Sequence, residues 1–224
     1  MALRLAVLIS GRGSNLRAIV DAIALGQAAC DAHIAVVVSD RADASGLEYA
    51  RSRGLHSRVV RIEDHADRAA WDRALGEAVL EAQPDVVVLA GFMRLVGPSF
   101  LGHFAGRAIN VHPALLPLFP GTRGPAQALA AGMRVSGCTV HVVDSGMDTG
   151  PILAQAVVPI APDDDAETLH ARIQGAEHLL LPRVIQAIAK GEISLSPELR
   201  VNASPDPESV LLSLASLAPI EQVP

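Results

Sequence analysis

The sequence predicts a doubly wound α/β fold, in which a mostly parallel sheet carries helices on both faces. Short runs of β-branched residues alternate with longer amphipathic stretches along most of the chain, and each connection is long enough for a crossover between parallel strands. The segment DVVVLA at residues 85–90 is apolar throughout, as is typical of a central strand covered on both faces. Half of the 224 residues are hydrophobic but only 3% are aromatic, so the core must consist mainly of Ala, Val, Leu and Ile.

Five strands and three helices are expected before residue 113. The strands are expected at residues 3–9, 33–39, 56–62, 85–90 and 108–112. The helices are expected at residues 15–25, 44–53 and 66–83, the last of them ending before Pro84. In the first helix the residues that form one apolar face are Leu16, Ile19, Val20 and Ile23. Ligands of such folds bind at the carboxyl ends of the strands, so we expect the site at that edge.

The segment after Pro113 predicts a change of architecture. A loop rich in Pro and Gly leads to a short helix at residues 126–131, and strands at 137–144 and 152–158 form a hairpin that makes the sheet mixed. Asp164 and Glu167 have the spacing of a capping box, which opens a long helix that ends near Ala189. Residues 196–224 are rich in proline with one short apolar segment, 210–217, and we expect a partly disordered extension or a docking helix.

Composition excludes several classes of protein. The formal net charge of −6 disfavours a nucleic-acid binder, because contacts with phosphates need a basic surface. The two cysteines, Cys30 and Cys138, lie far apart without CxxC or histidine-rich companions, so we expect buried thiols and neither a disulfide nor a metal site. No apolar run approaches the roughly 20 residues that span a bilayer, and the first is too short for a signal peptide. We therefore expect a cytoplasmic protein that binds neither nucleic acid nor membrane.

The turn after the first strand, SGRGSNL at residues 10–16, is a candidate phosphate site. Glycines between a strand and a helix let backbone N–H groups approach an anion, and the helix N-terminus adds positive potential. A tight strand–helix turn without a ligand would have the same residues. The third glycine of the dinucleotide motif is replaced by Leu16, and no Gly-Lys-Ser/Thr follows, so two better-known phosphate loops fit badly.

Asn110 and His112 close the fifth expected strand and form the candidate catalytic pair. The period of two along a strand places both side chains on one face. A carboxamide can stabilise an oxyanion through its N–H₂ group, while an imidazole can donate a proton from the same side. A carboxylate near His112 would stabilise the protonated ring. The turn at residues 144–151 supplies two candidates, Asp144 and Asp148, and pattern alone does not choose between them.

The segment GFMRLV at residues 91–96 follows the apolar strand directly. An aromatic, a methionine and aliphatic side chains around one arginine could line a flat pocket for a heteroaromatic ring. Packing against a helix would explain the same residues equally well.

Together, SGRGSNL, DVVVLAGFMRLV, NVHPALLPLFPG and GMDTGPILAQ resemble the phosphoribosylglycinamide formyltransferase family, the folate-dependent formyltransferases of de novo purine biosynthesis. The similarity runs from about residue 3 to 193. It implies a Rossmann-like formyltransferase domain over residues 1–195, with a phosphate-binding half at about 1–100 and a folate-binding, catalytic half at about 101–195, and with residues 196–224 as an extension.

The resemblance also implies the roles of individual residues. The catalytic residues are Asn110, His112 and Asp148, which favours Asp148 over Asp144. Residues implied to bind glycinamide ribonucleotide are Gly13, Ser14, Asn15, Gln174 and Glu177. Residues implied to bind 10-formyltetrahydrofolate, a cosubstrate, are Arg68, Met93, Arg94, Leu95, Val96, Asn110, Val143, Asp144 and Asp148. One departure is Arg123, which stands where the family usually has a histidine.

The implied reaction is direct formyl transfer to the substrate amine through a tetrahedral intermediate, without a metal, by a monomer or homodimer. Methionyl-tRNA formyltransferase is an alternative, but it needs a further RNA-binding domain and a basic surface. Formyltetrahydrofolate hydrolase is another, and it should carry an additional N-terminal domain. A dinucleotide-binding module would use Asp40, at the end of the second strand, to hold a ribose; the missing third glycine argues against it.

Overall fold

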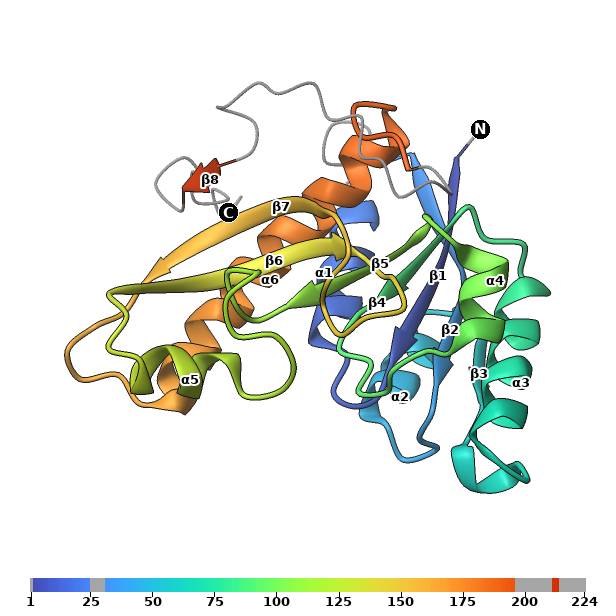
Figure 1. Cartoon of the computed structure of the whole chain (residues 1–224). Coiled ribbons are helices and arrows are strands. Elements are labelled where there is room, and N and C mark those ends of the chain that lie inside the picture. Colours follow the sequence, from blue (N-terminus) through green and yellow to red (C-terminus); the bar gives the residue numbers. More distant parts are fainter. Residues whose placement is uncertain (1, 25–30, 196–210, 214–224) are drawn as a thin grey trace.

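The computed structural model describes residues 2–24, 31–195 and 211–213, and the described strands form one sheet in the order β3-β2-β1-β4-β5-β6-β7-β8 (Figure 1). The strands are β1 (Leu3–Ile9), β2 (Ala32–Ser39), β3 (Ser57–Val59), β4 (Val86–Leu89), β5 (Ala108–His112), β6 (Val135–Val142), β7 (Ile152–Pro159) and β8 (Leu211–Ser213). Strands β1 to β5 all run parallel to their neighbours in this group. Strand β6 is antiparallel to both β5 and β7, and β8 is parallel to β7. The expected doubly wound, mostly parallel sheet with a terminal hairpin is confirmed.

Helices cover both faces of the sheet, as expected. They are α1 (Ser14–Ala24), α2 (Ser45–Ser52), α3 (Arg68–Leu80), α4 (Pro98–Phe104), α5 (Gly124–Ala130) and α6 (Ala166–Ala189), with a 3₁₀ turn, η1, at Ile62–Asp64. One apolar core lies between the sheet and α1, α2 and α6, and a second lies between the sheet and α3 and α4 (Figure 1). Within the described ranges no helix combines the length and hydrophobicity needed to cross a bilayer.

The alternation of side chains along β1 explains why both faces need a helical cover. Leu5, Val7 and Ile9 belong to the core under α1 and α6, whereas Ala6 and Leu8 belong to the core under α3 and α4. Strand β6 shows the same alternation: every second residue from Cys138 to Val142 belongs to the core under α6. The other face of β6 belongs to neither core. Polar side chains of β5 and β6 are gathered on that face, where they form the candidate site.

The direction in which strands are added to the sheet changes at β1, and this change sets the position of the site. From β1 the chain steps outward through β2 to β3 and then returns to the other side of β1 as β4, which creates the topological switch point of such sheets. Two hydrogen bonds join the turns that follow β1 and β4: Ser10 N donates to Gly91 O at 3.2 Å, and Met93 N donates to Ser10 Oγ at 2.8 Å. The candidate phosphate turn and the GFMRLV segment are therefore in contact.

Three expectations about local structure need correction, and one helix was missed. The third strand is limited to β3, because this edge strand pairs with β2 alone and the chain then turns into η1. Helix α4 was not expected from the sequence. The cap of α6 lies one residue later than expected, at Asp165 with Thr168; Asp164 accepts a hydrogen bond from Ala161 N instead. Of the expected apolar segment 210–217, the described part is the β8 strand; the rest of the C-terminal extension and Cys30 lie outside the described residues.

Candidate active site

The structure brings Asn110, His112 and Asp148 together at the carboxyl end of β5. Asn110 and His112 lie two residues apart on the strand, on the face opposite the core under α6 and next to Ala108 of the core under α3 and α4. Asp148 comes from the loop between β6 and β7, and its Oδ2 lies 3.4 Å from Nδ1 of His112. The imidazole is buried and Asn110 is half-buried, so the pair combines a fixed position with access to the surface.

Both ring nitrogens of His112 face oxygen atoms that accept hydrogen bonds. Nε2 lies 2.9 Å from the carbonyl oxygen of Phe119, which can only accept, so Nε2 carries a proton. Nδ1 faces Asp148. Burial alone would raise the pKa of Asp148, but hydrogen bonds from His141 and the Gly121 N–H, together with the charge of His112, hold this pKa below its usual value. An ionised Asp148 is placed to accept a hydrogen bond from Nδ1 of His112.

Asp144 has a different part in the same loop. Its Oδ1 accepts hydrogen bonds from Gly146 N at 3.0 Å and from Thr149 Oγ1 at 2.8 Å, so the side chain closes the turn. Asp148 is the aspartate that faces His112. The open choice between the two carboxylates at the sequence level is thus answered by position. Val143, also expected in this loop, is half-buried against the core under α3 and α4.

The turn after β1 meets helix α6 across the first core. Asn15 lies inside α1, and its Nδ2 donates to Glu177 Oε2 at 2.9 Å, across 162 residues of sequence. Burial raises the pKa of Glu177 to about 7, although the hydrogen bond from Asn15 opposes this shift. Gln174 lies three residues before Glu177 on the same side of α6 and is half-buried. Three of the residues expected to bind substrate are therefore gathered in two neighbouring helices.

Gly13 has a structural requirement of its own. Its φ is +69°, and a Cβ atom here would lie 2.9 Å from the Cα of Gly46, in the first turn of α2. The helix and the turn can approach this closely only because both residues are glycines. A close turn of this kind is compatible with an anion site. Ser14 begins α1 immediately after it.

The segment from Met93 to Val96 presents apolar side chains to the surface. Met93 is 73% exposed and Leu95 is 56% exposed, values that are high for large hydrophobic residues. Arg68, at the start of α3, donates a hydrogen bond to the carbonyl oxygen of Leu95 and stacks over the ring of Trp71 at 5.3 Å. Arg68 therefore anchors this segment, and the uncovered apolar surface suits a flat ring.

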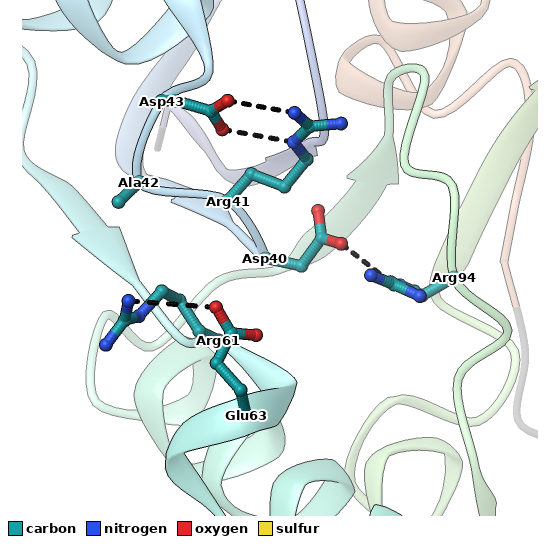
Figure 2. A pocket seen from close by; sticks show the side chains of 7 residues that line it. All are labelled: Asp40, Arg41, Ala42, Asp43, Arg61, Glu63 and Arg94. Atoms are coloured by element: carbon teal, nitrogen blue, oxygen red, sulfur yellow. Dashed lines mark hydrogen bonds and ion pairs between the residues drawn. The ribbon is translucent and has the colours of Figure 1, made fainter.

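A depression of about 430 Å³ lies beside this segment, and Figure 2 shows its lining residues. They are Asp40, Arg41, Ala42, Asp43, Arg61, Glu63 and Arg94. Most of its charges are neutralised within the depression: Arg41 pairs with Asp43, and Arg94 Nε donates to Asp40 Oδ2 at 2.8 Å. The side chain of Asp40 is only 1% exposed. An Asp40 bound in this way is poorly placed to hold a ribose, which weakens the dinucleotide-binding alternative.

Residues 3–185 match the model of the formyl transferase family. The chain belongs to this family. It is 50% identical over 186 residues to a phosphoribosylglycinamide formyltransferase of Mycobacterium tuberculosis, covering 83% of this chain and 85% of that protein. A crystal structure of glycinamide ribonucleotide transformylase 1 from Symbiobacterium toebii has 44% identity and a TM-score of 0.84, covering 89% of this chain and 93% of the other.

A longer relative contains the same region as one part. The chain is 45% identical over 203 residues to the trifunctional purine biosynthetic protein adenosine-3 of Drosophila pseudoobscura pseudoobscura. The match covers 91% of this chain but only 15% of that protein. Similarity to the Mycobacterium tuberculosis phosphoribosylglycinamide formyltransferase covers 83% of this chain, in keeping with the resemblance that the four sequence motifs carry.

Strained backbone gathers at the candidate site of this formyl transferase family member. In the described ranges four residues other than glycine have positive φ, and three of them are Phe119 (+56°), Arg123 (+71°) and Asp148 (+56°). Such conformations persist only where surrounding contacts hold them, and they concentrate at functional sites. Arg123 is exposed and stands at the N-terminus of α5. Nothing in the structure explains its replacement of the usual histidine.

His141 is a site residue of this formyl transferase family member that sequence reasoning missed. It stands opposite Asn110 in the β5–β6 ladder, and its Nε2 lies 3.2 Å from Asn110 Nδ2 and 3.5 Å from Asp148 Oδ1. Its Nδ1 lies 3.0 Å from Val142 O, so this nitrogen carries a proton. Neutral His141 accepts from Asn110 at Nε2, and the cation donates to Asp148. In the sequence, His141 lies two residues from Thr139, which places both side chains on one face of the strand. This spacing does not show that His141 faces Asn110.

Proposed function

We propose that this chain transfers the formyl group of 10-formyltetrahydrofolate to the amine of glycinamide ribonucleotide, in de novo purine biosynthesis. The observation that carries the proposal is the cluster of Asn110, His112 and Asp148, with Asp148 3.4 Å from the imidazole. An amide donor, an imidazole and a carboxylate at one surface can supply the oxyanion stabilisation and the proton transfer that assist acyl transfer to an amine. Similarity to proteins named phosphoribosylglycinamide formyltransferase supports the choice of acceptor.

In this proposal both halves of the domain contribute to the binding of each substrate. Residues from about 1 to 100 would hold the phosphate of the ribonucleotide on the N–H groups of Gly13, Ser14 and Asn15, where α1 begins. Glu177 and Gln174 would face its ribose. Residues from about 101 to 195 would supply the catalytic groups.

The exposed apolar surface at Met93 and Leu95 fits the flat ring of a folate. The other residues that would contact the folate are Arg68, Arg94, Val96, Val143 and Asp144. When bound, the folate supplies an electrophilic formyl carbon. Both substrates are small molecules, so the proposal calls for no nucleic acid, membrane or metal. The proposal also places the protein in the cytoplasm, as a monomer or homodimer.

The catalytic groups would act in sequence on one carbonyl. Asn110 would donate an amide N–H to the formyl oxygen while the neutral substrate amine attacks, and the His112 imidazolium would stabilise the same developing negative charge. His112, or a water that it polarises, would then deliver a proton to the folate nitrogen as the bond between this nitrogen and the formyl carbon breaks. The attacking amine, now bonded to that carbon, would return one proton to His112, directly or through the water. Asp148 would keep the ring oriented and cationic through Nδ1.

The test is an assay of purified protein with 10-formyltetrahydrofolate and glycinamide ribonucleotide, following tetrahydrofolate release by absorbance. Reactions without acceptor, with His112→Ala, and with the exposed His170→Ala as matched control accompany it. We expect release that needs the acceptor, disappears in His112→Ala and persists in His170→Ala. Release without acceptor would indicate a hydrolase, and wild-type activity in His112→Ala would overturn the catalytic assignment.

A further inference from the structure

A row of three side chains crosses the antiparallel end of the sheet beside the catalytic pair. His112 stands opposite Thr139 in the β5–β6 ladder, and Thr139 stands opposite Gln155 in the β6–β7 ladder. Residues directly opposite each other project from the same face. Cys138 and Ala156, the neighbours of Thr139 and Gln155 in sequence, belong to the core under α6. The row therefore lies on the face that carries the catalytic residues.

Thr139 and Gln155 hold the backbone of the loop that follows His112. The Thr139 hydroxyl donates to Ala114 O at 2.7 Å and accepts from Leu116 N at 3.0 Å. Gln155 Nε2 donates to Leu116 O at 2.9 Å and to Thr139 Oγ1 at 3.0 Å. A hydroxyl has one proton to donate and two lone pairs to accept with, so Thr139 uses its full capacity. Thr139 is completely buried, and loss of its hydroxyl would leave loop groups without partners.

Three residues after the anchored Leu116, the loop contacts the His112 imidazole through the Phe119 carbonyl. Leu116, the anchored residue, is separated from Phe119 only by Pro117 and Leu118, and Leu118 N bonds back to Leu115 O at 3.0 Å. Phe119 has a φ of +56°, and its carbonyl oxygen lies 2.9 Å from His112 Nε2. A residue other than glycine keeps such a φ only where its surroundings impose it. Apart from the contact with His112 itself, two anchors flank this carbonyl: Leu116 is held to the sheet by Thr139 and Gln155, and Gly121 N donates to Asp148 Oδ2 at 2.7 Å.

We propose that Gln155 and Thr139 are positioning residues, which set the catalytic orientation of His112 by anchoring residues 114–116 and so placing the Phe119 carbonyl. Neither residue touches the reacting atoms. The inference rests on the proposed catalytic role of His112. It assigns a function to Gln155 that the packing of β7 alone does not require, since an apolar side chain could fill the same place.

The test uses Gln155→Met, which keeps the length of the side chain without its donors, and the pair Thr139→Val and Thr139→Ser. We expect kcat of Gln155→Met and Thr139→Val to fall by about tenfold to a hundredfold per folded molecule, because small misplacements of catalytic groups have effects of this size. KM values for both substrates should stay within threefold. Thr139→Ser keeps the hydroxyl and should restore most of kcat. Ser136→Ala, a buried hydroxyl on the opposite face of β6, is the control and should match wild type.

A second readout does not depend on activity. The ¹⁵N chemical shift of His112 Nε2 reports its hydrogen bond to Phe119, and it should move in Gln155→Met and Thr139→Val but not in Ser136→Ala. Circular dichroism and thermal unfolding give the folded fraction. Variants that are less stable but keep wild-type kcat per folded molecule and an unmoved ¹⁵N shift would overturn the inference. If His112→Ala itself keeps full activity, the proposed function fails first; if His112→Ala is inactive while Gln155→Met keeps kcat within twofold, only the positioning role fails.

Discussion

Nε2 of His141 lies 3.2 Å from the carboxamide nitrogen of Asn110, directly across the β5–β6 ladder. The same nitrogen lies 3.5 Å from Asp148, so one imidazole contacts two members of the proposed catalytic trio. This arrangement links the orientation of the amide to the charge of the carboxylate. Strand β6 therefore extends the sheet and, because it pairs antiparallel with β5, also places His141 in the site.

Replacement of His141 by Leu should lower kcat by about tenfold to a hundredfold, because two catalytic groups lose a contact that orients them. His141 is among the groups that hold the pKa of Asp148 below its usual value, so this pKa should rise in the variant. Ionised Asp148 would then be lost at higher pH as the solution is acidified. The acid limb of the profile of kcat against pH should therefore move to higher pH; an unmoved limb would contradict the role of His141. His170→Leu, on the exposed side of α6, serves as control.

Asn110→Ala should lower kcat by about a hundredfold to a thousandfold, the usual effect of removing one oxyanion donor. Because the amide would bind the formyl oxygen mainly when negative charge develops there, KM for both substrates should change much less than kcat. Steady-state kinetics over both substrates separates the two. A variant with raised KM and unchanged kcat would assign Asn110 to binding alone.

Glu177→Gln should flatten the dependence of folding stability on pH. The carboxyl has a pKa of about 7 in the folded protein against 4.5 as its ordinary value, so the folded state binds a proton more tightly than the unfolded state. The wild-type free energy of unfolding should therefore decrease as pH rises from about 4.5 to 7, by on the order of 2–3 kcal/mol from this group. Urea unfolding at several pH values measures it, with the exposed Glu192→Gln as control. Parallel curves for wild type and Glu177→Gln would refute the shift.

Gly13→Ala should destabilise the protein by about 2 kcal/mol, since it places a side chain at positive φ and close to Gly46. Gly11→Ala is a matched control in the same turn, because a Cβ there has no neighbour within 4 Å and φ lies outside the left-handed region. We expect the control to unfold within about 1 kcal/mol of wild type. If the two variants lose stability equally, the close packing of the turn on α2 is not the cause.

Local sequence was sufficient for most of the sheet. The bounds of β1 and β5 agree with prediction, and the position of DVVVLA in β4 follows from an apolar run that only a strand buried on both faces needs. The placement of Asn110 and His112 on one face also followed from the period of two. Helix α4 escaped prediction because its first turn is capped from a distance: the carboxylate of Asp72, in α3, accepts hydrogen bonds from Gly97 N and Phe100 N.

The sequence alone thus specifies most of the elements, the end of the sheet where the site lies and the family motifs, because propensity and periodicity act over a few neighbouring residues. It leaves open which aspartate faces His112, that His141 joins Asn110, and that Thr139 and Gln155 hold the loop. Those relationships depend on the pairing register between β5, β6 and β7. The sequence of the loops that connect these strands does not indicate this register. A shift of one residue in that pairing would turn these side chains to the opposite face, so only the packed sheet establishes the site.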